Sequence, residues 1–210
     1  MTEPLDLSRK KLDPQPIATL ALRDGSVLRA LLDGISPAAK KTAIRENSFK
    51  ALMLLAERHP EALFPYWKYL VGLLNSDNGS AKYAAIHVIA ALAPADDAGR
   101  FEKAFNAFYA LLDDESVMVA SHVAGASGKI AKARPGLRRK ITRRLLEIDK
   151  THFDASRRDL VKSYIIQAFG EYIEGSRDRA KILAFVRQQL ESVSPKSRKL
   201  AKAFLARWEK

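Results

Sequence analysis

The chain has 210 residues and no cysteine, so disulfide bridges and thiolate metal ligands are excluded. This absence fits a reducing compartment, and we expect a cytoplasmic protein. No apolar run approaches the roughly 20 residues that a membrane-spanning helix needs, so no membrane association is predicted. The first residues, MTEPLDLSRKKLD, carry acidic side chains and no apolar core, so we expect no secretory signal there.

Motifs for catalysis or cofactor binding are missing as well. The histidines His59, His87, His122 and His152 lie in different segments, and none has a metal-ligand spacing such as HExxH. No glycine-rich nucleotide loop occurs. The sequence therefore predicts no cofactor, no metal site, no catalytic residue and no small-molecule substrate.

Acidic residues are scarce in the second half of the chain. The net charge is +12. Residues 1–105 hold 14 Lys and Arg against 12 Asp and Glu, whereas residues 106–210 hold 22 against 12. This asymmetry is typical of a surface that faces an acidic partner, although a basic surface also serves solubility alone.

The hydrophobic pattern predicts an all-α protein, because no segment alternates with period two for long enough to form a strand. We expect a flexible tail over residues 1–14 and a single domain over 15–210, with a short helix at 16–22. We expect Ser194 to cap the last helix and Gly175 to end an earlier one as a C′ glycine. Five helical pairs are predicted to follow the short helix, at 26–34 with 36–58, 61–74 with 80–93, 100–112 with 116–133, 137–148 with 156–174, and 177–190 with 195–208.

The second helices of these pairs repeat one pattern. An apolar or small residue precedes a mostly basic position, and apolar residues then recur at helical spacing. The aligned positions are Arg45, Lys82, Ala120, Lys162 and Arg198, which are 36 to 42 residues apart. This spacing is close to the period of about 40 residues found in stacked helical-pair proteins.

The repeats resemble HEAT repeats. The resemblance rests on the acidic or Asn-Asp turn (Asp77-Asn78 and Asp113-Asp114-Glu115), the basic position early in the second helix, and Gly128 or Gly170 near its end. It covers about residues 26–210. It implies a right-handed α-α superhelix, or solenoid, of about five HEAT-like pairs that acts as a binding scaffold.

Some alkylpurine DNA glycosylases are built from HEAT-like repeats and use aromatic residues and an Asp in a cleft. The present chain matches them in repeat type, size and charge only. Trp67 and Trp208 are far apart in the repeat order, so no catalytic residue is carried over.

Candidate binding residues come from the segment Ser116–Leu146, which contains no acid. On a helical wheel, Leu137, Ile141, Leu145 and Ile148 form a buried arc. Arg139, Lys140, Arg143 and Arg144 fall on the opposite arc, so we expect them to project into solvent. With Lys181 and Arg187 expected nearby, the candidates for contact with a polyanion or another partner are Lys129, Lys132, Arg134, Arg138, Arg139, Lys140, Arg143, Arg144, Arg157 and Arg158.

Two other sets of residues have either a structural role or a role in binding. The repeated basic positions Arg45, Lys82, Lys162 and Arg198 are expected to pair with turn acids of adjacent repeats, which is a structural role. A strip of second-helix residues is expected to form either a groove for a partner or simply a tight helix contact. It comprises Glu46, Lys50, Tyr83, His87, Ser121, Gly125, Lys129, Ser163, Gln167, Glu171, Lys199 and Arg207.

The sequence thus predicts a non-enzymatic scaffold whose basic C-terminal half binds another protein with an acidic surface. The alternative is a protein that binds nucleic acid, including a DNA-repair protein similar to the glycosylases.

Overall fold

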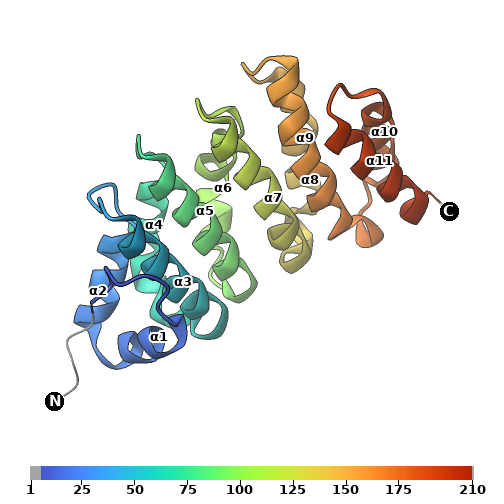
Figure 1. Ribbon diagram of the computed structural model, residues 1–210. Coiled ribbons are helices and arrows are strands. Elements are labelled where there is room, and N and C mark those ends of the chain that lie inside the picture. Colours follow the sequence, from blue (N-terminus) through green and yellow to red (C-terminus); the bar gives the residue numbers. More distant parts are fainter. Residues whose placement is uncertain (1–5, 210) are drawn as a thin grey trace. The chain divides into compact units, whose positions relative to one another are not determined.

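A computed structural model describes residues 6–209, and all regular secondary structure in that range is helical (Figure 1). The helices form two compact units, residues 1–100 and residues 101–210. Within residues 6–209, no helix has the length and apolar character needed to cross a membrane.

Unit 1 contains one extra helix and two helical pairs. Both second helices of the unit, α3 and α5, pack against each other, and α3 is also covered by α1 and α2. Two 3₁₀ turns precede α4, because Pro60 and Pro65 each remove a backbone donor from a regular helix. The helices are α1 (Pro14–Arg23), α2 (Gly25–Gly34), α3 (Thr42–Arg58), α4 (Trp67–Leu73) and α5 (Gly79–Leu92).

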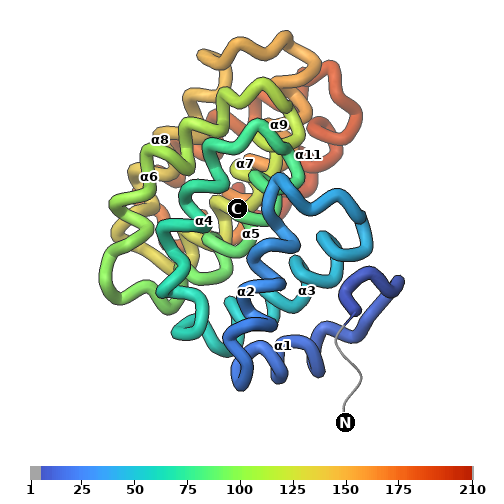
Figure 2. Tube along the Cα trace, turned by 90° about the vertical axis from the view of Figure 1, so that its left-hand side faces the viewer, coloured from blue at the N-terminus to red at the C-terminus, as the bar shows by residue number. Residues whose placement is uncertain are grey.

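Unit 2 contains three helical pairs. Its second helices α7, α9 and α11 pack side by side in one layer, and the first helices of the pairs form another (Figure 2). The helices are α6 (Arg100–Ala110), α7 (Val117–Ala133), α8 (Arg138–Leu146), α9 (Ala155–Gly170), α10 (Arg179–Gln188) and α11 (Pro195–Trp208). Helix α6 begins with the last residue of unit 1.

Small residues bring α7 and α9 close together. A Cβ atom placed on Gly128 would lie 2.9 Å from the Ala168 Cα and 2.6 Å from the Glu171 carboxylate. Because both helices are also lined with fully buried branched side chains such as Val123 and Ile165, this contact forms the centre of the unit 2 core.

The five predicted helical pairs are present, and the all-α prediction is confirmed. Ser194 caps α11 as predicted, accepting a hydrogen bond from the backbone N–H of Ser197 at 3.3 Å. The second helix of the first pair begins at Thr42 and not at residue 36, because Ser36 and Pro37 lie in a turn.

The predicted role of Gly175 is wrong. Helix α9 ends at Gly170, and Gly175 closes a short 3₁₀ turn. Among the glycines of residues 6–209 only Gly99 has a positive φ, of 64°, so Gly175 does not adopt the left-handed C′ conformation. Its carbonyl instead accepts a hydrogen bond from Arg138 Nη1 at 3.1 Å.

Residues 1–5 of the predicted tail lie outside the described residues. Beyond them, the Asn47 side chain of α3 donates hydrogen bonds to the carbonyls of Leu7 and Arg9, at 3.0 and 2.8 Å. Asp13 then caps α1 by accepting from the Gln15 N–H at 3.0 Å. Residues 7–13 are therefore attached to unit 1, and the flexibility of the tail and the single domain over 15–210 stay predictions.

The close approach of α7 and α9 is tested by Gly128→Ala. We expect this change to lower the free energy of unfolding by about 1–3 kcal/mol, because the new methyl group meets backbone that must move. Gly125→Ala on the same helix is the matched control, since its Cβ would lie 3.5 Å from Tyr164, an ordinary contact. It should be neutral or stabilising by up to about 1 kcal/mol.

Urea unfolding followed by circular dichroism measures both changes. Equal stability of the two variants would contradict the packing described here.

Candidate functional site

Helix α8 exposes three of the four basic residues that its hydrophobic pattern predicts on the solvent side, and the fourth, Arg144, is half-buried. Ile141, Leu145 and Ile148 are buried, and Leu137 is half-buried. Arg139, Lys140 and Arg143 lie on the remaining surface and are exposed. This group therefore faces solvent in unit 2.

Two other predicted candidates hold unit 2 together. Arg134 pairs with Glu102 of α6 at 2.5 Å. Arg138 donates to the carbonyls of Ala131 and Gly175, at 3.0 and 3.1 Å. These contacts connect α8 and the turn before it to elements distant in the chain, which is a structural role.

Arg144 is also engaged within the unit. Its guanidinium contacts Glu147 at 3.5 Å and donates to the Tyr109 carbonyl at 3.4 Å. Arg144 is therefore less available to a partner than Arg139 or Arg143.

Lys129 and Lys132 belong to a different surface, because they lie on α7 in the layer of second helices. Burial raises the pKa of the nearby Glu171 carboxyl, directly after α9, and the positive charges of Lys132 and Lys129 oppose that rise. These lysines thus have an acidic neighbour in the same unit.

Arg157 and Arg158 lie at the start of α9. Arg158 donates to the Asp149 carbonyl at 2.8 Å, and Arg157 lies 3.7 Å from the carboxylate of Asp154. The ten predicted basic residues are therefore distributed over the surface of α8, the layer of second helices and several contacts within unit 2.

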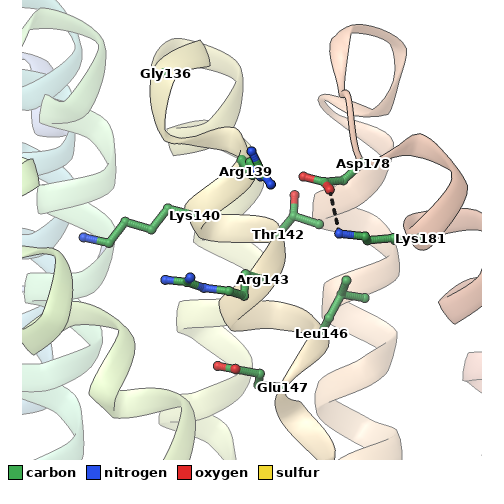
Figure 3. A pocket seen from close by; sticks show the side chains of 9 residues that line it. All are labelled: Gly136, Arg139, Lys140, Thr142, Arg143, Leu146, Glu147, Asp178 and Lys181. Atoms are coloured by element: carbon green, nitrogen blue, oxygen red, sulfur yellow. Dashed lines mark ion pairs between the residues drawn. The ribbon is translucent and has the colours of Figure 1, made fainter.

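An open cleft of about 470 Å³ lies on the exposed side of α8, between α8 and α10 (Figure 3). Arg139, Thr142 and Leu146 line one side of α8, and Lys181 of α10 lies opposite them. The full lining is Gly136, Arg139, Lys140, Thr142, Arg143, Leu146, Glu147, Asp178 and Lys181. A second cavity of about 670 Å³ shares Gly136, Arg139, Asp178 and Lys181 and adds Arg177.

The acids of the cleft are already paired. Asp178 lies 3.3 Å from Lys181, and Glu147 contacts Arg144 at 3.5 Å and Lys150 at 3.3 Å. Thr142 at the floor is buried and shares a hydrogen bond of 2.9 Å with the Tyr172 hydroxyl. The cleft acids are thus neutralised by neighbouring cations.

Three arginines in and beside the cleft have no such partner. Arg139, Arg143 and Arg177 form no ion pair with any residue between 6 and 209. Lys140 places its ammonium 3.9 Å from the centre of the Phe105 ring. Because a guanidinium group matches the planar geometry of a carboxylate or phosphate, the cleft is suited to an anionic ligand.

Arg177 was not among the predicted binding residues. The sequence predicted it as the first residue of the helix 177–190, whereas it lies in the turn before α10. Its approach to Arg139 depends on the packing of two helical pairs.

The repeated basic positions bind their own turns. Arg45 donates to the carbonyls of Ala39 and Lys40, at 2.6 and 3.2 Å. Arg198 likewise donates to the carbonyl of Ser192 at 2.6 Å. The predicted pairing with acids of adjacent repeats is therefore wrong for Arg45 and Arg198. The turn that precedes each helix supplies the carbonyl oxygens that accept their hydrogen bonds.

Lys162 and Lys82 occupy the same repeat position. Lys162 contacts Asp149 at 2.7 Å, in the turn of its own helical pair, and Asp159 at 3.7 Å. Lys82 is half-buried. At Lys162, too, the basic position supports the turn of its own pair.

The histidines do not assemble into a site. His152 contacts Asp113 at 2.7 Å, His59 contacts Glu61 at 3.4 Å, and His87 packs on Tyr83. Burial lowers the pKa of the fourth, His122. Within residues 6–209, no group of three His, Asp or Glu side chains is placed to bind a metal ion.

Comparison with known proteins places the fold. No protein-family model matches the chain, and no curated protein matches it. A designed armadillo repeat protein, YIII(Dq)4CqI, is 19% identical, with a TM-score of 0.54 over 92% of this chain and 90% of that one. A second, YIII(Dq.V1)4CPAF, solved in complex with the peptide (KR)4, is 18% identical, with a TM-score of 0.56 over 92% and 98%.

The crystal structure of an engineered protein is similar at 17% identity and a TM-score of 0.54, over 92% of this chain and 89% of that one. At these identities the likeness shows the fold alone. The chain is therefore an all-α helical-repeat protein with the fold of an α-solenoid. Its assignment to HEAT repeats stays a prediction.

The different roles of two adjacent arginines are tested by Arg138→Met and Arg139→Met. We expect Arg138→Met to lower the free energy of unfolding by about 1–2 kcal/mol, because two carbonyls lose a charged donor. Arg139→Met should change it by less than about 0.5 kcal/mol, because that side chain is exposed and forms no ion pair with residues 6–209. Thermal and urea unfolding measure both. A larger loss in Arg139→Met would reverse the assignment.

Proposed function

We propose that the protein is a non-enzymatic scaffold that binds another protein through an acidic segment. The observation that carries the proposal is the cleft between α8 and α10, which we call the arginine cleft. Arg139 and Arg143 line it, Arg177 lines the cavity beside it, and none of the three forms an ion pair with residues 6–209. A carboxylate-bearing segment would supply the ion pairs that the unit does not make within itself.

The fold supports polypeptide binding. One structural neighbour, a designed armadillo repeat protein, is solved in complex with the peptide (KR)4. We propose that the present chain also holds a polypeptide, but one of opposite charge, because residues 106–210 carry 22 basic and 12 acidic residues.

The strength of binding follows from the exposure of the cleft. An ion pair open to solvent contributes only about 0–1 kcal/mol, so three pairs supply at most about 3 kcal/mol. This corresponds to roughly a hundredfold in affinity. The basic unit also accelerates encounter with an acidic partner, and salt weakens that effect.

Nucleic acid is the second candidate partner, because the same arginines suit phosphate. The acid-free segment 116–146 also favours it, but the structure divides this segment between α7 and the surface of α8. The glycosylase-like activity stays a prediction. Trp67 and Trp208 belong to different units, and neither lines the cleft.

The proposal is tested with the triple variant Arg139→Gln, Arg143→Gln, Arg177→Gln. We expect its affinity for a fluorescein-labelled peptide of eight glutamates to fall about 10- to 100-fold at low salt, because the three ion pairs are lost. The control Arg23→Gln, Arg29→Gln, Lys68→Gln removes the same charge from exposed positions in unit 1 and should retain most of the affinity.

Fluorescence anisotropy measures the binding, and a duplex DNA of the same fluorophore is titrated in parallel. Equal losses in both triple variants would show that net charge, and not the cleft, drives binding. Tighter binding of the DNA than of the peptide, abolished by the cleft variant, would favour the second candidate.

A further inference from the structure

A separate apolar pocket of about 170 Å³ lies in unit 1, between the second helices α3 and α5. Ile35, Phe49, Tyr83 and Ala84 supply its apolar walls. Phe49 and Tyr83 are half-buried, so their rings are partly open to solvent on a surface built by packed helices. The pocket is large enough to receive one apolar side chain.

Ring packing fixes the aromatic wall. The ring centres of Phe49 and Tyr83 are 5.0 Å apart, and His87 packs on Tyr83 at 4.6 Å. Phe49 also lies 6.1 Å from His87, edge to face. Because three rings from two helices contact one another, the wall is formed before a ligand arrives, which lowers the ordering cost of binding.

The surroundings of the pocket are basic. Arg45 and Glu46 both line the pocket, and Lys41 and Lys50 are the chain neighbours of the lining residues Thr42 and Phe49, so basic residues outnumber the acid on the α3 side. Arg45 lines the pocket, and its guanidinium is bonded to the carbonyls of Ala39 and Lys40, so its charge is not neutralised there. This charge favours an anionic ligand and opposes a cationic one.

We propose that this pocket holds one apolar side chain, of about the size of Phe or Leu, from an acidic segment of the partner protein. The proposal rests on the proposed function, because it takes the partner to be an acidic polypeptide. It adds a specific contact that the arginine cleft does not supply, the apolar side chain bound in the pocket, which we call the apolar anchor. Among acidic segments, the pocket favours those that carry such a side chain, whereas charge alone does not distinguish them.

The test compares two peptides, Glu-Glu-Phe-Glu-Glu and Glu-Glu-Ala-Glu-Glu, the first carrying 4-fluorophenylalanine. We expect the phenylalanine peptide to bind about tenfold more tightly, because the ring leaves water. Titration calorimetry measures the affinity, and the fluorine resonance shows whether the ring enters a protein environment. A lysine-flanked phenylalanine peptide should bind more weakly than the glutamate-flanked one.

Ser80→Leu blocks the mouth of the pocket from an exposed position, the second residue of α5. It should remove the tenfold advantage of phenylalanine. The matched control is Ser156→Leu at the exposed second position of α9 in unit 2, which should keep the advantage. Thr42→Leu, at the first residue of α3, is a second blocking variant should Ser80→Leu fold poorly.

The outcomes separate the two proposals. If both glutamate peptides bind equally, or if Ser156→Leu reduces the advantage as much as Ser80→Leu, the anchor proposal is wrong and the arginine cleft stands. If the phenylalanine advantage persists in the Arg139→Gln, Arg143→Gln, Arg177→Gln variant with no other loss of affinity, the pocket is supported and the cleft is not. If neither peptide binds, both proposals fail.

Discussion

The second helices of this protein carry more apolar surface than one partner helix covers. In α9, Val161, Ile165, Ile166 and Phe169 are all buried although they point in several directions around the helix. The helix buries this surface by packing against α7 and α11, and against the turn Ile148–Lys150 of its own pair. Such lateral packing is the defining property of stacked helical repeats, because each repeat completes the core of its neighbour.

The same lateral packing also explains which helix surfaces of unit 2 are buried and which are exposed to solvent. The second helices α7, α9 and α11 have 14 to 17 residues, whereas α8 and α10 have 9 and 10. A short first helix buries one side against the second-helix layer and leaves the rest to solvent. The basic residues of α8 are therefore exposed as a consequence of repeat packing, and the space beside them is the arginine cleft.

Helical periodicity was sufficient to predict the five pairs and the exposure of Arg139, Lys140 and Arg143, because both depend on residues within a few turns of one another. It did not predict the structural roles of the neighbouring arginines. Arg134 and Arg138 find partners 32 and 37 residues away, at Glu102 and at the Gly175 carbonyl. Such partners become neighbours only through tertiary packing.

The errors have local physical causes. Pro60 and Pro65 convert the start of the predicted helix at 61–74 into 3₁₀ turns. Gly175 resembled a C′ glycine because a helix was expected to reach residue 174, whereas α9 ends at Gly170. Backbone carbonyls, which have no sequence signature, took the place of acids as partners of Arg45 and Arg198.

The two proposed contacts differ in their physics, and that difference determines what each contributes to recognition. Exposed guanidinium groups in the cleft act over about 10 Å at ordinary ionic strength, so they attract many acidic chains and discriminate poorly. The pocket of Phe49 and Tyr83 acts only on contact, and its contribution scales with apolar area rather than charge. Raising the salt concentration therefore weakens the first contribution and spares the second. A scaffold with both contacts is attracted to acidic partners in general and retains those that carry a suitable apolar side chain.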